Sequence, residues 1–366
     1  MVPINRPLLG REEEGAIIEV IRSGILTNAS PEGGPNCRAF ESELASSLGA
    51  KHCIVANSGT AALQIALMAA GIGNGDEVIV PSFTFIATAS AVVLCGAKPV
   101  FVDIDPETYN MSPSMAEGAI TDRTKAIMPV DLYGLPANFD EMRRIAKERD
   151  VALIEDACQA QGASYHGTMA GLLGNAGCFS FYAGKVMTTG EGGAVVTNDE
   201  YLAEKARRIR THGQIKGYDS ASLGGNFRMP EIEAAIGREQ LKKLKSFLAI
   251  RAENAKMMME GLEKTDLKLP EVPKGSVPNW YLFTVRCKTN AQREKIKKKL
   301  NEAGIGATVY YPTPVHRTPL YAKMGYLRIK LVETERASET VLSLPVNPVV
   351  TKDDIESTVR IIRNEM

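Results

Sequence analysis

The sequence has no excess of charge of either sign. Its 366 residues include 43 lysine and arginine residues and 43 aspartate and glutamate residues, so the formal net charge at pH 7 is zero. No global field attracts nucleic acid or anionic lipid, and small molecules are the expected partners. The apolar stretches are too short to span a bilayer, and no basic segment followed by an apolar run opens the chain. We therefore expect a cytoplasmic protein without a membrane or nucleic-acid partner.

The signatures of several common enzyme sites are also absent. The six cysteines form no C-x-x-C pair, which favours reduced, mostly buried thiols over disulfides or a metal site. No metal site is expected from the histidines either, because all four are far apart in the sequence. The chain has neither a G-x-x-x-x-G-K sequence nor a G-x-G-x-x-G sequence after a strand. Nucleotide hydrolysis and hydride transfer therefore lack their usual motifs.

What is present is the pattern of an α/β protein. Hydrophobic residues make up 44% of the chain and charged residues 23%, enough for a large core and more than one domain. Short β-branched runs alternate with longer helical stretches, which predicts a large, mostly parallel sheet covered by helices. The seven expected strands are residues 52–57, 77–82, 98–105, 124–131, 151–157, 177–182 and 192–198.

The pattern changes after residue 230. A long charged amphipathic stretch at 230–262 predicts a helix that links two domains. Further on, the sequence predicts a small α+β domain, with strands at 280–287 and 305–311 and helices at 291–304 and 351–365. We expect a large domain at 1–235, followed by the linking helix and small domain at 236–366. No internal repeat or low-complexity segment is present.

Polar residues follow the expected strands, where ligands bind in open α/β sheets. Ser58 and Gly59 turn the chain after the first strand, and Thr60 opens an apolar helix. Free backbone N–H groups and the positive helix end suit a phosphate. Ordinary capping of the helix by a hydroxyl explains the same residues equally well.

Two further loops carry groups suited to a flat, charged ring. Phe83 and Phe85 follow the second strand, where an aromatic side chain can cover a ring, although core packing is the commoner outcome. Asp156 ends a strongly hydrophobic strand, beside Glu155 and three residues before Gln159. A buried carboxylate needs a partner, and the alternatives are a helix cap or a cation such as a protonated ring nitrogen.

The last loop contains a lysine. Ser180 lies on the sixth strand, Lys185 follows it, and the sequence TTGEGG leads into the next strand. A phosphate seat, an aromatic residue, a carboxylate and a lysine together suit pyridoxal 5'-phosphate, which has a phosphate ester, a protonated pyridine and an aldehyde that condenses with an amine.

The chain resembles the DegT/StrS family of pyridoxal phosphate-dependent nucleotide-sugar aminotransferases, which have the aspartate aminotransferase-like fold (fold type I). The similarity runs nearly end to end, through NSGTAALQIAL, GDEVIVPSFTFIATASAV, IEDACQAQGA, FSFYAGKVMTTGEGGAVVTND, NFRMPEIEAAIG and YYPTPVHRTPLY. Two segments depart from the family pattern. The segment 23–41 is looser than the usual Gly-Pro turn, and YAGK replaces a commoner proline-containing approach to the lysine.

The resemblance implies roles for individual residues. Lys185 would be the catalytic lysine that holds the cofactor as an internal aldimine, Asp156 would pair with the pyridine nitrogen, and Gln159 would reach the ring hydroxyl. Phe85 would stack on the ring. The resemblance places Ser58, Gly59, Thr60 and Ser180 at the phosphate, with Asn226 reaching in from the second subunit of a homodimer that shares its active sites.

The resemblance also implies the reaction. An amino acid, most often glutamate in this family, would give its amino group to a keto-deoxysugar carried on a nucleotide diphosphate. Alternatives are a synthase or dehydratase of the same family, although Lys185 argues against the dehydratase, and a non-catalytic regulator. Four residues are expected near the sugar, each with an alternative role in the core, in a turn or at an interface: Arg228, Tyr310, Tyr311 and His316.

Overall fold

The large domain is built on one sheet of seven strands. The computed structural model describes residues 1–366, and its sheet order is β1-β9-β8-β5-β4-β2-β3. The pairs from β3 to β8 are parallel, whereas β9 runs antiparallel to both β8 and β1. All seven expected strands, and the mostly parallel sheet, are confirmed. Their bounds are β1 (His52–Ala56), β2 (Glu77–Pro81), β3 (Lys98–Val102), β4 (Thr124–Ile127), β5 (Ala152–Asp156), β8 (Ala176–Ser180) and β9 (Gly193–Thr197).

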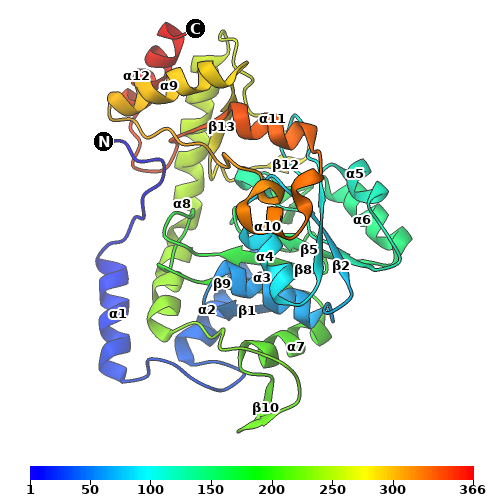
Figure 1. The fold of residues 1–366 in the computed structure, drawn as a ribbon. Coiled ribbons are helices and arrows are strands. Elements are labelled where there is room, and N and C mark those ends of the chain that lie inside the picture. Colours follow the sequence, from blue (N-terminus) through cyan, green and yellow to red (C-terminus); the bar gives the residue numbers. More distant parts are fainter.

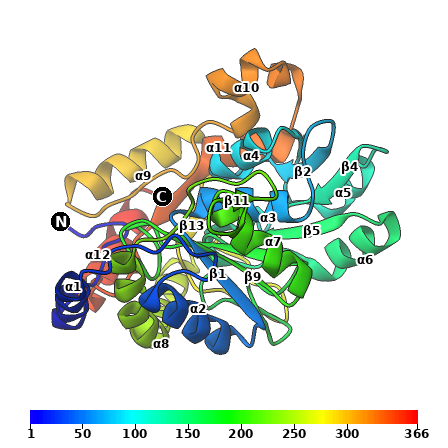
Figure 2. The same ribbon diagram turned by 90° about the horizontal axis from the view of Figure 1, so that it is seen from below.

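Both faces of this sheet are buried, which explains why its strands are apolar runs. Figures 1 and 2 show helices on either side of the sheet. Alternate residues of β1 point to opposite faces: Ile54 packs in a core cluster with α3, α4 and α7, whereas Val55 packs in another with α2 and the start of α8. The helices of this domain are α1 (Arg11–Ser23), α2 (Pro35–Leu48), α3 (Gly59–Ala69), α4 (Ala87–Leu94), α5 (Pro113–Gly118), α6 (Phe139–Arg149) and α7 (Glu200–Arg210).

Short elements decorate the large domain. A three-stranded sheet has the order β12-β6-β7, and β10 pairs with β11. A 3-10 turn, η1 (Leu132–Gly134), follows β4. The small strands are β6 (Ser164–Tyr165), β7 (Thr168–Met169), β10 (Gln214–Lys216), β11 (Asp219–Ser220) and β12 (Ser276–Val277).

The expected linking helix is α8 (Glu231–Leu262), which runs along the molecule from the large domain to the small one (Figure 1). Its first half packs on α2, and its last turns join the core of the small domain. That domain pairs two antiparallel strands and covers them with helices. The elements from residue 283 onward are β13 (Phe283–Arg286), α9 (Asn290–Glu302), η2 (Val315–Arg317), α10 (Pro319–Lys323), η3 (Tyr326–Arg328), α11 (Val332–Thr340), β14 (Val341–Leu344) and α12 (Lys352–Asn364). Of these, η2, α10 and η3 pack on the core of the large domain through Val315, Tyr321 and Tyr326.

The strand expected at 305–311 is wrong. This segment forms only isolated bridges, from Ile305 to Val2 and from Thr308 to Ser343. Its backbone hydrogen bonds are divided between two partners: Gly306 N donates to Val2 O, and Thr308 N donates to Ser343 O. The N-terminal residues therefore lie on the small domain, far in sequence from its core. None of the helices combines the length and hydropathy that a bilayer crossing requires.

Candidate active site

The turn after β1 begins the site. Ser58 has an extended backbone, and its Oγ accepts a hydrogen bond from Ala61 N at 3.1 Å, so this hydroxyl caps α3. Gly59 packs so closely that an added Cβ would lie 2.6 Å from Ser180 Cβ and 3.1 Å from Cys158 Sγ. A side chain at Gly59 would therefore force apart three loops. The half-buried Thr60 lies in the first turn of α3, where backbone N–H groups and the helix dipole suit an anion.

Asp156 lies at the end of β5 and is 3% exposed. Its carboxylate accepts hydrogen bonds from Thr88 Oγ1 at 2.8 Å and from Cys158 N at 3.2 Å. Both donors are neutral, and Asp156 forms no salt bridge within the chain. A buried carboxylate held by two neutral donors fits a cationic ligand group.

Lys185 is half-buried in the loop after β8 and also forms no salt bridge. Its Nζ lies 4.7 Å from the centre of the Tyr281 ring. Loss of water by burial lowers the pKa of Lys185, while the charges of Cys158, Asp156 and Tyr182 oppose that change. A lowered pKa raises the fraction of neutral amine, which is the nucleophilic form.

The residues expected at the ring, Gln159 and Phe85, both contact Tyr311. Gln159 Nε2 donates to the Tyr311 hydroxyl at 3.2 Å, and Gln159 Oε1 accepts from Tyr133 N at 2.9 Å. Phe83 and Phe85 differ sharply: Phe83 is fully buried in the core, whereas Phe85 is 57% exposed with its ring centre 6.3 Å from that of Tyr311. Phe85 is therefore the aromatic residue placed to cover a ligand.

Ser180 ends β8 and is 8% exposed. Its carbonyl accepts a hydrogen bond from Gln161 Nε2, and its Oγ accepts one from Tyr182 N at 3.4 Å. Because Ser180 also packs on Gly59, the structure brings the ends of β1, β5 and β8 together, as the sequence predicted.

The residue expected to reach the cofactor phosphate from the second subunit, Asn226, and the residues expected at the substrate lie on segments outside the sheet. Asn226 is exposed, and its carbonyl accepts from Asn57 Nδ2 at 3.2 Å. Arg228 is half-buried and has no salt-bridge partner. Tyr310 and Tyr311 are half-buried, and the Tyr133 hydroxyl donates to the Tyr310 carbonyl.

His316 has a different environment from the one expected. Its ring is fully buried, its Nδ1 lies 2.6 Å from Ser82 Oγ, and its Nε2 lies 3.6 Å from Glu335 Oε1. Burial and the nearby Arg317 lower the pKa of His316. In this structure, His316 presents no surface to a substrate and instead holds Ser82 in the loop after β2.

Two residues of the site escaped the sequence analysis. Thr88, the donor to Asp156, lies in the apolar helix α4, where a buried hydroxyl is a usable signal. Tyr281 precedes β13 and was interpreted only as part of a strand; nothing in the sequence places it near Lys185.

Two buried acids lie behind Asp156. The Glu155 carboxylate accepts from Gly171 N at 2.5 Å and Leu173 N at 2.8 Å. Asp131 Oδ1 accepts from Ala137 N at 3.0 Å, while its Oδ2 has no donor. Burial and the Glu155 charge raise the pKa of Asp131 well above its usual range. The raised pKa favours the neutral, protonated form of Asp131 beside the Glu155 carboxylate.

Comparison with known proteins gives matches over nearly the whole chain. A model of the DegT/DnrJ/EryC1/StrS aminotransferase family matches residues 7–363. The chain is 42% identical over 319 residues to a Geobacillus stearothermophilus protein named "Pleiotropic regulatory protein", covering 86% of this chain and 85% of the relative. It is 41% identical over 316 residues to UDP-2-acetamido-2-deoxy-3-oxo-D-glucuronate aminotransferase of Pseudomonas aeruginosa, covering 86% of each chain.

Solved structures agree. The structure of Streptomyces venezuelae DesV in complex with a ketimine intermediate superposes with a TM-score of 0.92 at 37% identity, covering 99% of this chain and 98% of that one. The pyridoxal phosphate form of Spr1654 from Streptococcus pneumoniae gives 0.93 at 26% identity, covering 100% and 99%. The predicted aspartate aminotransferase-like fold is thus confirmed.

Proposed function

Because the chain belongs to the DegT/DnrJ/EryC1/StrS aminotransferase family, whose members depend on pyridoxal phosphate, we propose that it moves an amino group from glutamate to a keto-deoxysugar carried on a nucleotide diphosphate. The observation that carries this proposal is the pair Lys185 and Asp156. A lysine with a lowered pKa and a buried carboxylate without a cation meet at the carboxyl ends of β5 and β8.

The residues present fit the cofactor. When bound, pyridoxal phosphate supplies an aldehyde that condenses with amines and a protonated ring that takes up electrons. Gly59 brings the first turn of α3 close to Ser180, and the backbone N–H groups of that turn suit a phosphate. Asp156 would hold the ring nitrogen in its protonated form, and Phe85 would cover the ring. The remaining cofactor residues of the proposal are Ser58, Thr60, Gln159 and, from the partner subunit, Asn226.

Lys185 would have two roles. Its amine would bond the cofactor until the amino donor displaces it, and the freed Nζ would then carry a proton between the donor carbon and the cofactor. Proton transfer by a positioned group contributes about 10²–10⁴ to the rate, most effectively when the pKa lies near the working pH. The desolvation that lowers the pKa of Lys185 serves both steps.

The sugar side of the proposal rests on three residues. Arg228 has no salt-bridge partner within the chain, so its guanidinium is free for a diphosphate or a donor carboxylate. Tyr311 contacts both Gln159 and Phe85, two residues proposed to hold the cofactor, and Tyr310 packs against Tyr311. The relative from Pseudomonas aeruginosa is named for a nucleotide-linked sugar, which supports this substrate class.

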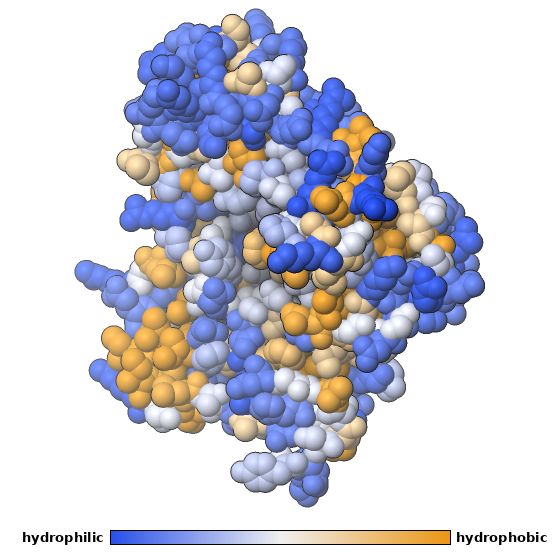
Figure 3. Space-filling view, viewed as in Figure 1, coloured by the Kyte–Doolittle hydropathy of each residue, from blue (hydrophilic) through white to orange (hydrophobic).

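A homodimer belongs to the same proposal. Figure 3 shows apolar side chains gathered over the position of α1, while the small domain is mostly hydrophilic on this face. Exposed apolar residues on and after α1 are Ile18, Ile21, Ile25 and Leu26. Burial of this patch by a second copy would remove it from water.

The direct test is product analysis. The protein, loaded with pyridoxal phosphate and supplied with glutamate, is incubated with nucleotide-linked keto sugars, and products are identified by mass spectrometry. We expect one sugar to exchange its oxo group for an amino group while glutamate becomes 2-oxoglutarate. Loss of water from the sugar without amino transfer would instead identify a dehydratase, and no reaction with any sugar would favour the regulator.

A further inference from the structure

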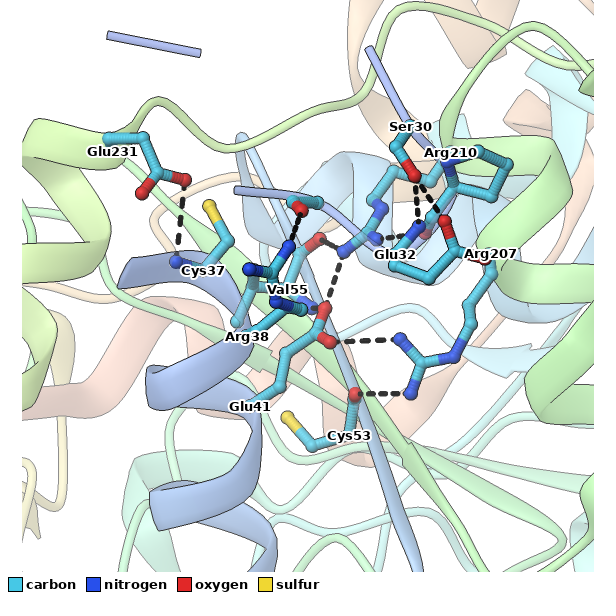
Figure 4. Close-up of polar contacts among 12 residues, drawn as sticks. Ser30, Glu32, Cys37, Arg38, Glu41, Cys53, Val55, Arg207, Arg210 and Glu231 are labelled. Atoms are coloured by element: carbon cyan, nitrogen blue, oxygen red, sulfur yellow. Dashed lines mark hydrogen bonds and ion pairs between the residues drawn. The ribbon is translucent and has the colours of Figure 1, made fainter. Parts of the chain in front are cut away.

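Arg210 joins three segments from a buried position. It ends α7, and its side chain is 2% exposed. Figure 4 shows its guanidinium joined to Glu41 of α2 and to the backbone of Val55 in β1. One nitrogen, Nη1, donates to the Glu41 carboxylate and to the Val55 carbonyl at 3.0 Å, and Nη2 donates to the Pro31 carbonyl. The side chain therefore fixes the loop containing Pro31 to β1.

The backbone of Arg210 and Thr211 holds a further segment, which contains Asn226 and Phe227. Phe227 N donates to the Arg210 carbonyl at 3.0 Å, and Thr211 pairs with Asn226. On its other side, Phe227 O accepts from Asn57 N at 2.9 Å. Asn57 directly precedes the turn proposed to bind the phosphate, so the placement of that turn and of Asn226 depends on the end of α7.

Three further hydrogen bonds hold the loop before α2 and the first turn of that helix. The fully buried Glu231 carboxylate accepts from Asn36 N at 2.6 Å, and Glu231 N donates to Leu26 O at 3.0 Å. Arg38 Nη1 donates to Gly33 O at 2.7 Å. Thr27, which lies between the hydrogen-bonded residues Leu26 and Gly33, is exposed to solvent.

Stability alone does not account for an arginine here. A buried ion pair is often no more stabilising than apolar residues of similar volume. A guanidinium differs in presenting several donors in a rigid plane, and Arg210 uses them on one carboxylate and two carbonyls from three different segments. Lysine, with one flexible ammonium group, cannot reach all three in this arrangement.

We infer that Arg210 is a positioning residue for cofactor binding: its side chain holds β1, which leads into the turn at Ser58, against α2 and the loop containing Pro31, while its backbone carbonyl bonds the segment containing Asn226. This inference rests on the proposed function, because that function places the cofactor phosphate at this turn. Arg210 touches none of the reacting groups and acts through the segments that it holds.

The chain supplies a matched control in Arg207. This residue lies one turn earlier on α7, and its Nη1 donates to the same Glu41 carboxylate at 2.8 Å. Its remaining contact is with Cys53 O at 3.4 Å, and it touches neither Pro31 nor the segment at Asn226. Replacing Arg207 perturbs the ion pair without releasing the two segments.

The test compares Arg210→Lys with Arg207→Lys. For each protein we would measure the dissociation constant of pyridoxal phosphate, the hydrogen exchange of peptides covering 26–34 and 224–229, and the Tm. We expect Arg210→Lys to weaken cofactor binding about tenfold, because hydrogen bonds from a charged group are worth about this factor. The peptide covering 26–34, which loses the hydrogen bond to Pro31 O, should exchange faster, whereas the peptide covering 224–229 keeps its bond to the backbone carbonyl of residue 210 and serves as an internal control. Arg207→Lys should leave cofactor binding and exchange within about twofold of the wild type.

Other results would overturn the inference. Equal effects of the two substitutions, or a lowered Tm in Arg210→Lys with unchanged cofactor binding and exchange, would assign Arg210 to stability alone. Should Arg210→Lys not fold, Glu41→Gln removes the charge partner of both Arg210 and Arg207, and its effect on cofactor binding and exchange is compared with that of Arg207→Lys. Wild-type protein that binds the cofactor but aminates no sugar would count against the proposed function and leave this inference standing.

Discussion

The two sides of the candidate site are built differently. On the cofactor side, Ser58, Asp156 and Ser180 lie at or directly after strands of one sheet, so the ladder hydrogen bonds fix their spacing. On the sugar side, Arg228 and Tyr311 lie on irregular segments held by isolated contacts. Under the proposed function, the difference means that a rigid sheet positions the residues of the chemistry, whereas substrate choice depends on loops that can vary without disturbing it.

The largest effect should come from the cofactor side. Thr88 Oγ1 and Cys158 N donate to different oxygens of Asp156, so Asp156→Asn keeps one of these two hydrogen bonds and removes the charge. We expect kcat to fall on the order of 10²–10³-fold, as for other single electrostatic groups in active sites. Steady-state kinetics with a saturating nucleotide sugar measures it. An unchanged kcat would end the assignment of Asp156 to the ring nitrogen.

A substitution on the sugar side should change binding instead. Arg228→Met removes a guanidinium that has no salt-bridge partner within the chain, and we expect the KM for the nucleotide sugar to rise about tenfold to a hundredfold. The cofactor spectrum should stay the same. Arg208→Met, which breaks only a surface ion pair with Glu204, serves as the control. A changed cofactor spectrum in Arg228→Met would contradict the assignment of Arg228 to the sugar side alone.

The acid pair behind Asp156 should make the cofactor side sensitive to pH. The pKa of Asp131 is raised on folding, so its contribution to stability is complete below the unfolded value of about 4 and is lost as pH rises toward the folded value. Within that window the cost is about 1.4 kcal/mol per pH unit. Asp131→Asn keeps a donor toward Glu155 and cannot ionise.

Urea denaturation of wild type and Asp131→Asn between pH 5 and about 8 checks this prediction. The wild type should lose free energy of unfolding with rising pH more steeply than the variant. Parallel curves would show that Asp131 carries no proton in the folded protein.

The smallest effect should come from His316, which was expected at the substrate but lies buried against Ser82. His316→Gln should cost about 1 kcal/mol of stability, the worth of one hydrogen bond, and leave the KM for the sugar unchanged. Because the pKa of His316 is lowered on folding, its contribution is present above pH of about 6.5 and is lost as pH falls. A raised KM with normal stability would restore the original expectation.

The positions of several cofactor-side residues could be predicted from the sequence, because the hydrophobic pattern and the strand order determine which polar residues, such as Asp156, lie at the carboxyl ends of strands. The sugar side could not. The segment 305–311 has the composition of a strand, yet its hydrogen bonds are divided between Val2 and Ser343, which no local pattern reveals. The approach of Tyr281 to Lys185 depends on how the small domain packs on the large one. Phe83 and Phe85 differ only in tertiary burial.

The most direct test of the central claim is the absorption spectrum of the protein loaded with pyridoxal phosphate, before and after addition of glutamate, for wild type and Lys185→Ala. Our account predicts a near-visible band from the lysine-bound cofactor in the wild type, which bleaches when glutamate takes the place of Lys185. The variant should lack the lysine-bound band. A band that resists glutamate in the wild type, or that is identical in Lys185→Ala, would contradict the assignment of Lys185 as the catalytic amine.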